Sequence, residues 1–505
     1  AGSVPQALTV AGGTLFFNAD DGINGGELWK SDGTEDGTVL VKDIRPGGSH
    51  SNIIEMVSIG DIVYFRADDG NIGRELWRSD GTEEGTYLLK DIWTGWESSD
   101  PQSFTPIGDR LFFRAEDGES GHELWISDGT ESGTVMIENM TSNENDSDPM
   151  DFTKVGNRIV FSAAAGWNDR ELWSFDPTEI LYHSIEGMHW SITPSLPEGL
   201  SLDSSTGKIT GIPTEVIDWT DYTVTLTASN PETGSYFYNG NGTAWMVKDV
   251  KPGSYSSHPH DLTAMGNMFF FSAFSDDNNA NEELWKSDGT ASGTVRVKDI
   301  NSGSDSSSPE DLIVVGNTLY FTADDGTNGR ELWKSDGTEA GTVMVKDINS
   351  GSGSSVSEGA SDEALSKVLD NTLYFRATDG TNGTELWKSD GTASGTVMVK
   401  DINSGSGNSY PSYLTVFNNE LYFSATDGLG GSGGGNGTEL WKSDGTANGT
   451  VMVKDINVGN HASPQQLTVV GNTLFFTAHV DGNGRELWKS NGTESGTMMV
   501  KDING

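Results

Sequence analysis

Residues 331–348 read ELWKSDGTEAGTVMVKDI, and this stretch decides the fold because close copies of it recur along the chain. The Glu-Leu-Trp triplet begins at Glu27, Glu75, Glu123, Glu171, Glu283, Glu331, Glu385, Glu439 and Glu486. The successive spacings are 48, 48, 48, 112, 48, 54, 54 and 47 residues. A period near 48 residues is typical of four-stranded propeller blades. The sequence therefore predicts one blade for each copy.

The copy at residues 308–348 shows the internal pattern of a repeat most clearly. Its β-branched and aromatic residues predict strands up to Val315, then at 318–323, 331–335 and 342–348, with turns of Gly, Asn and Asp between them. No segment has apolar residues at helical spacing over ten residues. We therefore predict an all-β fold, a β-propeller of nine four-stranded blades.

The two ends of the sequence fall at the same point of the repeat. Residues 5–17 (PQALTVAGGTLFF) align with residues 464–476 (PQQLTVVGNTLFF), so nine whole blades result without a strand exchanged between the first and the last. A closed ring of nine blades exceeds the usual four to eight. An open solenoid is the structural alternative.

The spacing of 112 residues exceeds one repeat by 64 residues and marks an insertion in blade four. Residues 178–237 contain Pro- and Gly-rich turns and alternating β-formers, which predict a small β-sandwich. Insertion at the tip of a hairpin is well tolerated. The predicted domains are residues 1–177 (blades one to three and the first part of blade four), 178–237 (the insert) and 238–505 (the last strand of blade four to blade nine).

Composition excludes several classes of partner. Among 505 residues, 75 are acidic and 30 are basic, so the formal net charge is -45. Nucleic-acid binding needs clustered Lys and Arg, and anionic membrane surfaces attract basic segments. The absence of cysteine excludes disulfides and thiolate metal sites. No apolar run approaches the roughly 20 residues of a membrane helix, and no signal peptide opens the sequence, so membrane insertion is not expected.

Two resemblances rest on motifs already quoted. The ELWKSDGT-x-x-GT-x-x-VKDI unit resembles the repeat family of secreted bacterial and archaeal proteins named after its ELW-x-x-DGT motif, from which Phe175-Asp176-Pro177 and Ser490-Asn491-Gly492 depart. The insert, through residues 196–200 (LPEGL) and 207–211 (GKITG), resembles immunoglobulin-like, cadherin-related domains of microbial surface proteins. These resemblances imply an extracellular or cell-surface location and adhesion rather than catalysis.

Two motif residues have a structural and a functional interpretation. The Trp of each ELW triplet, flanked by Leu in a strand, is predicted to pack between blades; sugar stacking is the alternative. The Asp of each Ser-Asp-Gly-Thr segment is predicted to form a tight hairpin turn, in loose similarity to the Asp-box hairpins of sialidases.

A third set of residues predicts calcium sites. In a four-stranded blade, the loop between the second and third strands shares one face with the blade-to-blade loops, and acidic and Asn residues gather there. Oxygen ligands on Gly-rich loops suit Ca²⁺, and a solvated acidic turn is the alternative. The candidate ligands are Asp20, Asp21, Asn24, Asp68, Asp69, Asp324, Asp325, Asn328, Asp379 and Asn382.

Other residues of the same face are candidates for ligand binding. Trp93 and Trp96 lie between blades two and three, and Trp167 lies in blade four. Arg74, Arg170 and His122 hold the position before ELW, which varies from blade to blade. Loop aromatics beside polar residues suit carbohydrate binding, although such rings also fold down over blade edges.

The sequence favours a non-catalytic adhesion or scaffold module at the cell surface or outside the cell, with calcium as stabiliser and a surface glycan or another surface protein as partner. A lectin that uses the loop aromatics of blades two to four is the alternative. An enzyme of sialidase or lyase type is less favoured, since no nucleophile elbow, phosphate loop or metalloprotease motif is present. Neither nucleic acid nor an organic cofactor is expected.

Overall fold

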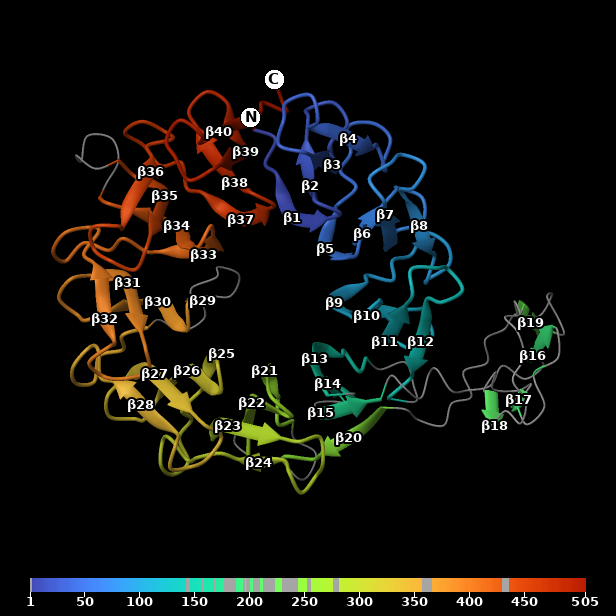
Figure 1. The fold of residues 1–505 in the computed structure, drawn as a ribbon, viewed down its shortest axis with the longest axis horizontal. Coiled ribbons are helices and arrows are strands. Elements are labelled where there is room, and N and C mark those ends of the chain that lie inside the picture. Colours follow the sequence, from blue (N-terminus) through green and yellow to red (C-terminus); the bar gives the residue numbers. More distant parts are fainter. Residues whose placement is uncertain are drawn as a thin grey trace. The chain divides into compact units, whose positions relative to one another are not determined.

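The computed structural model describes residues 2–141, 146–156, 158–164, 166, 169–176, 188–193, 196, 200–202, 209–211, 223–228, 244–251, 256–275, 281–356, 366–428 and 436–505. Contacts divide the chain into two compact units, Ala1–Ser174 with Ala244–Gly505, and Phe175–Thr243. The first unit is a ring of nine four-stranded antiparallel sheets (Figure 1). The predicted all-β propeller of nine blades is confirmed, and the described residues contain no helix.

The strands of blades one to four are β1 (Gln6–Ala11), β2 (Thr14–Asp20), β3 (Gly26–Ser31), β4 (Val39–Lys42), β5 (Ile54–Ile59), β6 (Ile62–Asp68), β7 (Arg74–Ser79), β8 (Tyr87–Lys90), β9 (Gln102–Ile107), β10 (Arg110–Glu116), β11 (His122–Ser127), β12 (Val135–Glu138), β13 (Met150–Val155), β14 (Arg158–Ala164), β15 (Arg170–Phe175) and β20 (Ala244–Lys248). The strands of blades five to nine are β21 (His260–Met265), β22 (Met268–Phe274), β23 (Glu282–Ser287), β24 (Val295–Arg296), β25 (Glu310–Val315), β26 (Thr318–Asp324), β27 (Arg330–Ser335), β28 (Val343–Lys346), β29 (Ser366–Leu369), β30 (Thr372–Thr378), β31 (Thr384–Ser389), β32 (Val397–Lys400), β33 (Ser412–Phe417), β34 (Glu420–Thr426), β35 (Thr438–Ser443), β36 (Val451–Lys454), β37 (Gln465–Val470), β38 (Thr473–Val480), β39 (Gly484–Ser490) and β40 (Met498–Lys501).

The hydrophobic core lies between blades. At the junction of blades five and six, Phe270 and Leu284 of one sheet pack with Leu319, Phe321 and Trp333 of the next. Both faces of a sheet are thus covered by its neighbours, which explains why β22, β26 and β34 each bury five consecutive residues instead of alternating. The ELW tryptophans are buried except Trp173, which is partly exposed, so their predicted core role is confirmed.

Turn residues set the hairpins. Between β33 and β34, Asn418 and Asn419 have φ angles of 52° and 61°, the left-handed pair that matches the twist of a two-residue hairpin. In Ser-Asp-Gly-Thr, the Asp336 carboxylate accepts hydrogen bonds from the Thr338 amide at 2.8 Å and from the Thr338 hydroxyl at 2.7 Å. These bonds confirm the predicted turn-forming role of the motif aspartate.

The ring closes between its first and last blades. Ser3 donates from its amide to Glu486 Oε1 of blade nine at 2.8 Å, and Lys489 Nζ donates to the Gly33 carbonyl of blade one at 2.6 Å. Leu15 and Trp29 of blade one share a core with Phe475 and Leu487 of blade nine. An open solenoid is therefore set aside.

The second unit, taken by itself, contains two antiparallel strand pairs among its described residues. β16 (Met188–Thr193) pairs with β19 (Thr223–Ala228), and β17 (Leu200–Leu202) pairs with β18 (Ile209–Gly211). The segment enters after β15 and returns at β20, the third and fourth strands of blade four. Its description as a β-sandwich stays a prediction. The described residues include no helix long and apolar enough to cross a membrane.

Candidate functional site

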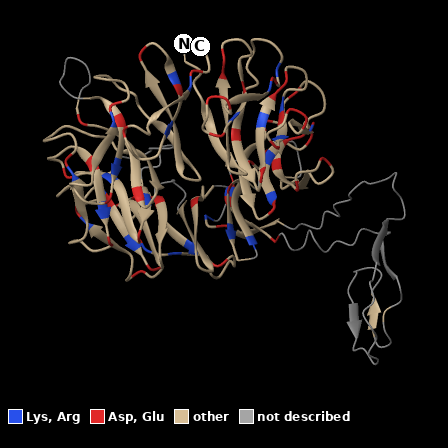
Figure 2. Cartoon of the chain, turned by 45° about the horizontal axis from the view of Figure 1, so that its top comes forward, with Lys and Arg blue, Asp and Glu red and all other residues tan. Residues whose placement is uncertain are grey.

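Loops at the two ends of the blades form two distinct surfaces of the propeller unit. The linker face consists of the loops between second and third strands and the blade-to-blade loops, which contact each other: the Ser51 amide donates to the Gly26 carbonyl at 3.0 Å. The hairpin face consists of the first turns of the blades and the Ser-Asp-Gly-Thr turns. In Figure 2, acidic residues lie in many of the loops and basic residues lie along several strands.

A buried glutamate, the first residue of ELW, organises the linker face in every blade. Glu331 is fully buried and accepts hydrogen bonds from the Ile348 amide at 3.0 Å and the Ser355 hydroxyl at 2.6 Å. It thereby ties the start of the third strand to the loop that leaves the blade. Glu171 in the interrupted blade keeps the same partners, the Val250 amide and the Ser257 hydroxyl. This role was not part of the sequence prediction, although the invariant glutamate in an otherwise apolar strand was its signal.

Burial changes the ionisation of these glutamates. Loss of hydration raises the pKa of Glu27, Glu75, Glu123, Glu171, Glu283 and Glu385 to about 7, and that of Glu439 to about 8. The hydrogen bonds that the carboxylates accept oppose this rise without cancelling it. The pKa of Glu331 and of Glu486 is raised for the same reason. Nine carboxyl groups with weakened acidity therefore surround the ring.

The predicted calcium ligands lie on the linker face and bond to their own loops. The Asp325 carboxylate accepts from the amides of Thr327 and Asn328 at 2.9 and 2.8 Å, and from the Asn328 side chain at 2.8 Å. Burial acts to raise the pKa of Asp325, but these bonds outweigh it, so that the pKa is lowered. Asp21 with Asn24, and Asp379 with Asn382, repeat the arrangement.

The other predicted ligands are divided between neighbouring groups. Asp20 and Asp324 each accept from the amide two residues ahead at 2.7 Å, and Asp69 accepts from the amides of Asn71 and Ile72. Asp68 pairs with Arg45 at 2.6 Å. Within the described ranges, no three His, Asp or Glu side chains come together in a way that could hold a metal ion.

The two described candidate tryptophans have different surroundings. The indole of Trp93 lies against Gly118 in the second loop of blade three. Trp96 is 77% exposed on the blade-to-blade loop. Trp167 lies outside the described residues. Of the two described side chains, only that of Trp96 is largely exposed.

The arginines that precede ELW make different contacts in different blades. Arg74 is exposed and pairs with Asp100 at 2.6 Å. Arg170 donates to the carbonyl and hydroxyl of Ser162 at 3.2 and 3.3 Å, and burial lowers its pKa. Arg330 in the same position is 3% exposed. Of these three side chains, Arg74 is exposed, Arg170 is partly buried and Arg330 is buried.

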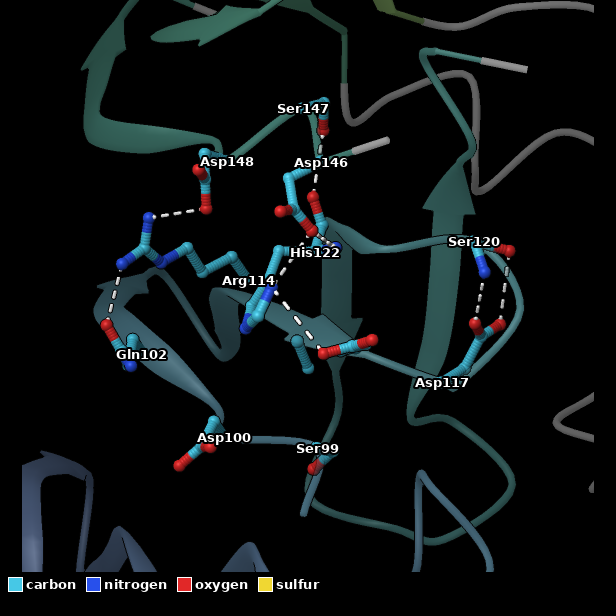
Figure 3. A network of polar contacts seen from close by, with 12 residues as sticks. Ser99, Asp100, Gln102, Arg114, Asp117, Ser120, His122, Asp146, Ser147 and Asp148 are labelled. Carbon is cyan, nitrogen blue, oxygen red and sulfur yellow. Dashed lines mark hydrogen bonds and ion pairs between the residues drawn. The ribbon is translucent and has the colours of Figure 1, made fainter. Parts of the chain in front are cut away.

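Blade three carries a polar network on the linker face (Figure 3). The His122 ring lies 3.1 Å from Asp146 and 3.8 Å from Glu116. Burial acts to raise the pKa of Asp146, but hydrogen bonds and the charge of His122 lower it overall. Arg114 bonds to Asp148 at 2.9 Å and to Gln102 at 2.6 Å. The network therefore ties residues 146–148 to the second and third strands of blade three.

The central channel bears a second set of residues that differ between blades. In the first strands, a bulge holds one non-glycine residue at positive φ, as in Asp311 with φ 57°. The equivalent residues in other described blades are Ala7, Glu55, Ser103, Asp151, Asp261, Tyr413 and Gln466. The strand position was predicted from sequence, but the bulge that selects these residues was not.

The channel residues of blades two to six line an open cavity of about 500 Å³. It includes Glu55, Asp151, Asp261 and Asp311. Although solvent reaches these side chains, the surrounding wall removes part of their hydration, which raises the pKa of Asp151 and of Asp311; neighbouring carboxylates add to the effect. The cavity wall is therefore acidic.

Comparison with known protein families gives a match for one part of the chain. The family model described as "Putative Ig domain" matches residues 171–240, which supports the resemblance of the insert. No curated protein matches the chain. Membership of the ELW-x-x-DGT repeat family remains a prediction from the motif.

Solved structures with some likeness include propeller peptidases. A puromycin hydrolase mutant complexed with PGG is 11% identical with a TM-score of 0.39, over 86% of this chain and 58% of that one. A prolyl endopeptidase is 13% identical with a TM-score of 0.36, over 87% and 52%. A puromycin-hydrolyzing peptidase of Mycobacterium tuberculosis is 10% identical with a TM-score of 0.39, over 89% and 60%. The chain thus spans about half to three fifths of their length, and likeness at this level carries no information on activity.

Proposed function

We propose that the chain is a non-catalytic module of the cell surface or extracellular space that binds a surface partner through its linker face and channel. One observation carries the proposal: the frame repeats in nine blades, whereas the channel position changes from Ala7 to Glu55, Ser103, Asp151 and Tyr413. Variable side chains on a rigid, repeated scaffold are typical of binding sites. The resemblance of the insert to domains of microbial surface proteins supports the same location.

The acidic cavity indicates what kind of group the partner presents. Glu55, Asp151, Asp261 and Asp311 favour basic segments of a surface protein over anionic polysaccharides, because a concave wall of one charge concentrates its field. Such binding weakens as salt concentration rises.

The test uses beads coated with the full chain. We expect them to adhere to a surface coated with a Lys-rich protein and not to an alginate surface, with adhesion falling as NaCl increases. The triple variant Asp151→Asn, Asp261→Asn and Asp311→Asn should lose adhesion. Its matched control is Asp32→Asn, Asp288→Asn and Asp336→Asn on the hairpin face, which removes the same charge. Equal loss in both triple variants would reject the channel as the binding surface.

A lectin is the second candidate, favoured by Trp96. A tryptophan that is 77% exposed offers a flat apolar ring for stacking on a sugar. Arg74 and Asp100 provide hydrogen-bonding groups on the same face, and the Ser98 hydroxyl oxygen accepts from the Arg74 amide at 3.0 Å. A printed glycan array is the test, with Trp96→Ala expected to abolish binding and Val458→Ala, which removes an exposed side chain in another loop, expected to leave it unchanged. Binding that survives Trp96→Ala would reject this candidate.

A further inference from the structure

A lysine fastens most blades to the next one. Lys298, after the short β24, donates from Nζ to the Thr342 carbonyl of blade six at 2.8 Å and lies over the Trp333 ring at 5.9 Å. Among the described residues, the same lysine-to-carbonyl bond is present at eight of the nine seams between blades. The other pairs are Lys42–Thr86, Lys90–Thr134, Lys248–Thr294, Lys346–Thr396, Lys400–Thr450, Lys454–Thr497 and Lys501–Thr38.

At the seam between blades three and four, the charged side chain accepts a hydrogen bond instead of donating one. Glu138 ends β12, at the position that a lysine holds at the end of the other fourth strands or, for Lys298, just after β24. Its Oε2 accepts from the Ala244 amide at 3.0 Å. Ala244 begins β20. When blade four is aligned with blade six on Lys248-Asp249 and Lys346-Asp347, Ala244 takes the position of Thr342. In blade six the equivalent amide bonds within its own turn, from Thr342 to the Glu339 carbonyl. The insert replaces that turn in blade four, so the freed amide is bonded by a carboxylate from blade three.

A second fastening is also missing at this seam. In blade six, Lys334 donates to the Gly391 carbonyl of blade seven at 2.8 Å. The equivalent residue of blade three is Ile126, which is buried and has no charge to offer. At the following seam Arg158 restores the bond by donating to the Gly289 carbonyl at 3.1 Å. An arginine therefore replaces the missing lysine bond at the seam between blades four and five. Among the described residues, no such replacement is present at the seam between blades three and four.

Other described contacts across this seam lie nearer the channel and on the linker face, where the Ser147 hydroxyl donates to Glu123 Oε2 at 2.6 Å and the His122 amide donates to Asp146 at 2.7 Å. The Phe112 and Phe152 rings are 6.5 Å apart, and Arg114 bonds to Asp148 at 2.9 Å. Among the described contacts, packing and an ion pair hold the inner part of the seam, and the bond from the Ala244 amide to Glu138 lies in its outer part.

We propose that the seam between blades three and four is the opening point of the ring, and that Glu138 sets how readily it opens by holding β20. β20 is also the strand through which the insert returns to the propeller. Binding or tension at the insert therefore reaches the ring at the seam that, among the described residues, lacks both lysine bonds. Opening there would change the spacing of the channel residues of blades three and four without unfolding any blade.

Hydrogen exchange of the full chain, measured by mass spectrometry, tests the proposal without any substitution. We expect the amides of β20 and β12 to exchange at least tenfold faster than those of β28 and β32, which hold the same positions in blades six and seven. Equal protection of the two pairs of strands would overturn the proposal, since exchange reports local opening.

Two substitutions then assign the effect to Glu138. Glu138→Lys places a donor against the Ala244 amide and should speed exchange in β20 by a further tenfold, whereas Glu138→Gln keeps an acceptor oxygen and should change it less than threefold. The matched control is Lys298→Glu, which reverses the fastening at a regular seam and should speed exchange in β28 only. If Glu138→Lys folds and leaves β20 exchange unchanged, Glu138 is not the fastening residue.

Discussion

A comparison of blade six with blade four shows which residues of the repeat stabilise the linker-face end of a blade and which stabilise its hairpin-face end. Both keep the buried glutamate of the linker face, Glu331 and Glu171, with equivalent amide and serine partners. Only blade six keeps the Ser-Asp-Gly-Thr hairpin, in which Ser335 and Thr342 share a hydrogen bond of 2.8 Å. In blade four Phe175 holds the position of Ser335, and the hydroxyl of the preceding Ser174 is buried without a partner in the described structure. The two ends of a blade are therefore stabilised independently.

The largest effect should come from pH, because the glutamate anchor is common to both blades and recurs nine times. A folded-state pKa of about 7 for Glu171 and Glu283, against an ordinary 4.5, means that the folded state binds more protons between these values. Stability is then greatest near the ordinary pKa and is lost as pH rises through about 7. Below about pH 4 the turn aspartates such as Asp336, whose pKa is lowered by bonds from Thr338, lose their contribution.

The melting temperature at constant ionic strength should therefore fall from pH 5 to pH 8 and also fall below pH 4. Glu283→Gln removes one of the buried glutamates, so the fall in melting temperature between pH 5 and pH 8 should become smaller by the contribution of that one residue. A melting temperature that rises steadily from pH 5 to pH 8 would contradict the inferred burial of nine protonatable groups.

Removing the anchor should have the next largest effect, and it should be equal in the two blades. Glu331→Ala leaves the Ile348 amide and the Ser355 hydroxyl buried without an acceptor, at a cost of about 3 kcal/mol in unfolding free energy. Glu171→Ala should cost the same within about 1 kcal/mol, because its partners are equivalent. Urea denaturation measures both, and a much smaller cost for Glu171→Ala would show that the insert has loosened the linker side as well.

A smaller effect should separate the blades on the hairpin side. Ser335→Ala removes the partner of the Thr342 hydroxyl and of the Gly337 amide, so it should destabilise by about 1 to 2 kcal/mol. Ser174→Ala removes an unpartnered buried hydroxyl and should be neutral or slightly stabilising. The melting temperatures of the two variants and of the parent chain test this difference. Equal destabilisation by the two substitutions would mean that the Ser174 hydroxyl has a hydrogen-bond partner.

The same comparison explains what could be read from the sequence. Strand positions in blade six followed from its turns and apolar residues, and the role of Trp333 followed from its place in a strand covered on both faces. The task of Glu138 could not be deduced, because it depends on an amide of blade four that lies 106 residues away and is freed by the insert. Likewise, the channel position of Asp311 depends on a bulge, which shifts register without a distinctive sequence signal.

Calcium should produce the smallest effect, confined to regular blades. Asp324, Asp325 and Asn328 in blade six have counterparts in other blades, whereas blade four has Ala164 and Gly166 near the same place. The Asp325 carboxylate already accepts three hydrogen bonds from its loop, so a cation adds to an ordered turn instead of creating one. For weak extracellular sites with Kd near 1 mM, 10 mM calcium stabilises by about 1.4 kcal/mol for each occupied site.

Screening of a net charge of -45 would also stabilise the ring, so the ions must be compared at matched ionic strength. We expect the melting temperature in 10 mM CaCl₂ to exceed that in chelator with NaCl by about 1 to 2 °C for each occupied site. MgCl₂ should reproduce less than half of this rise, because Mg²⁺ keeps its water ligands more firmly. Asp325→Ala should reduce the calcium increment, whereas Asp336→Ala on the hairpin face should lower the melting temperature but leave the increment intact. An identical increment in all three chains, or none in any, would leave the acidic loops as hydrogen-bonded turns without a metal.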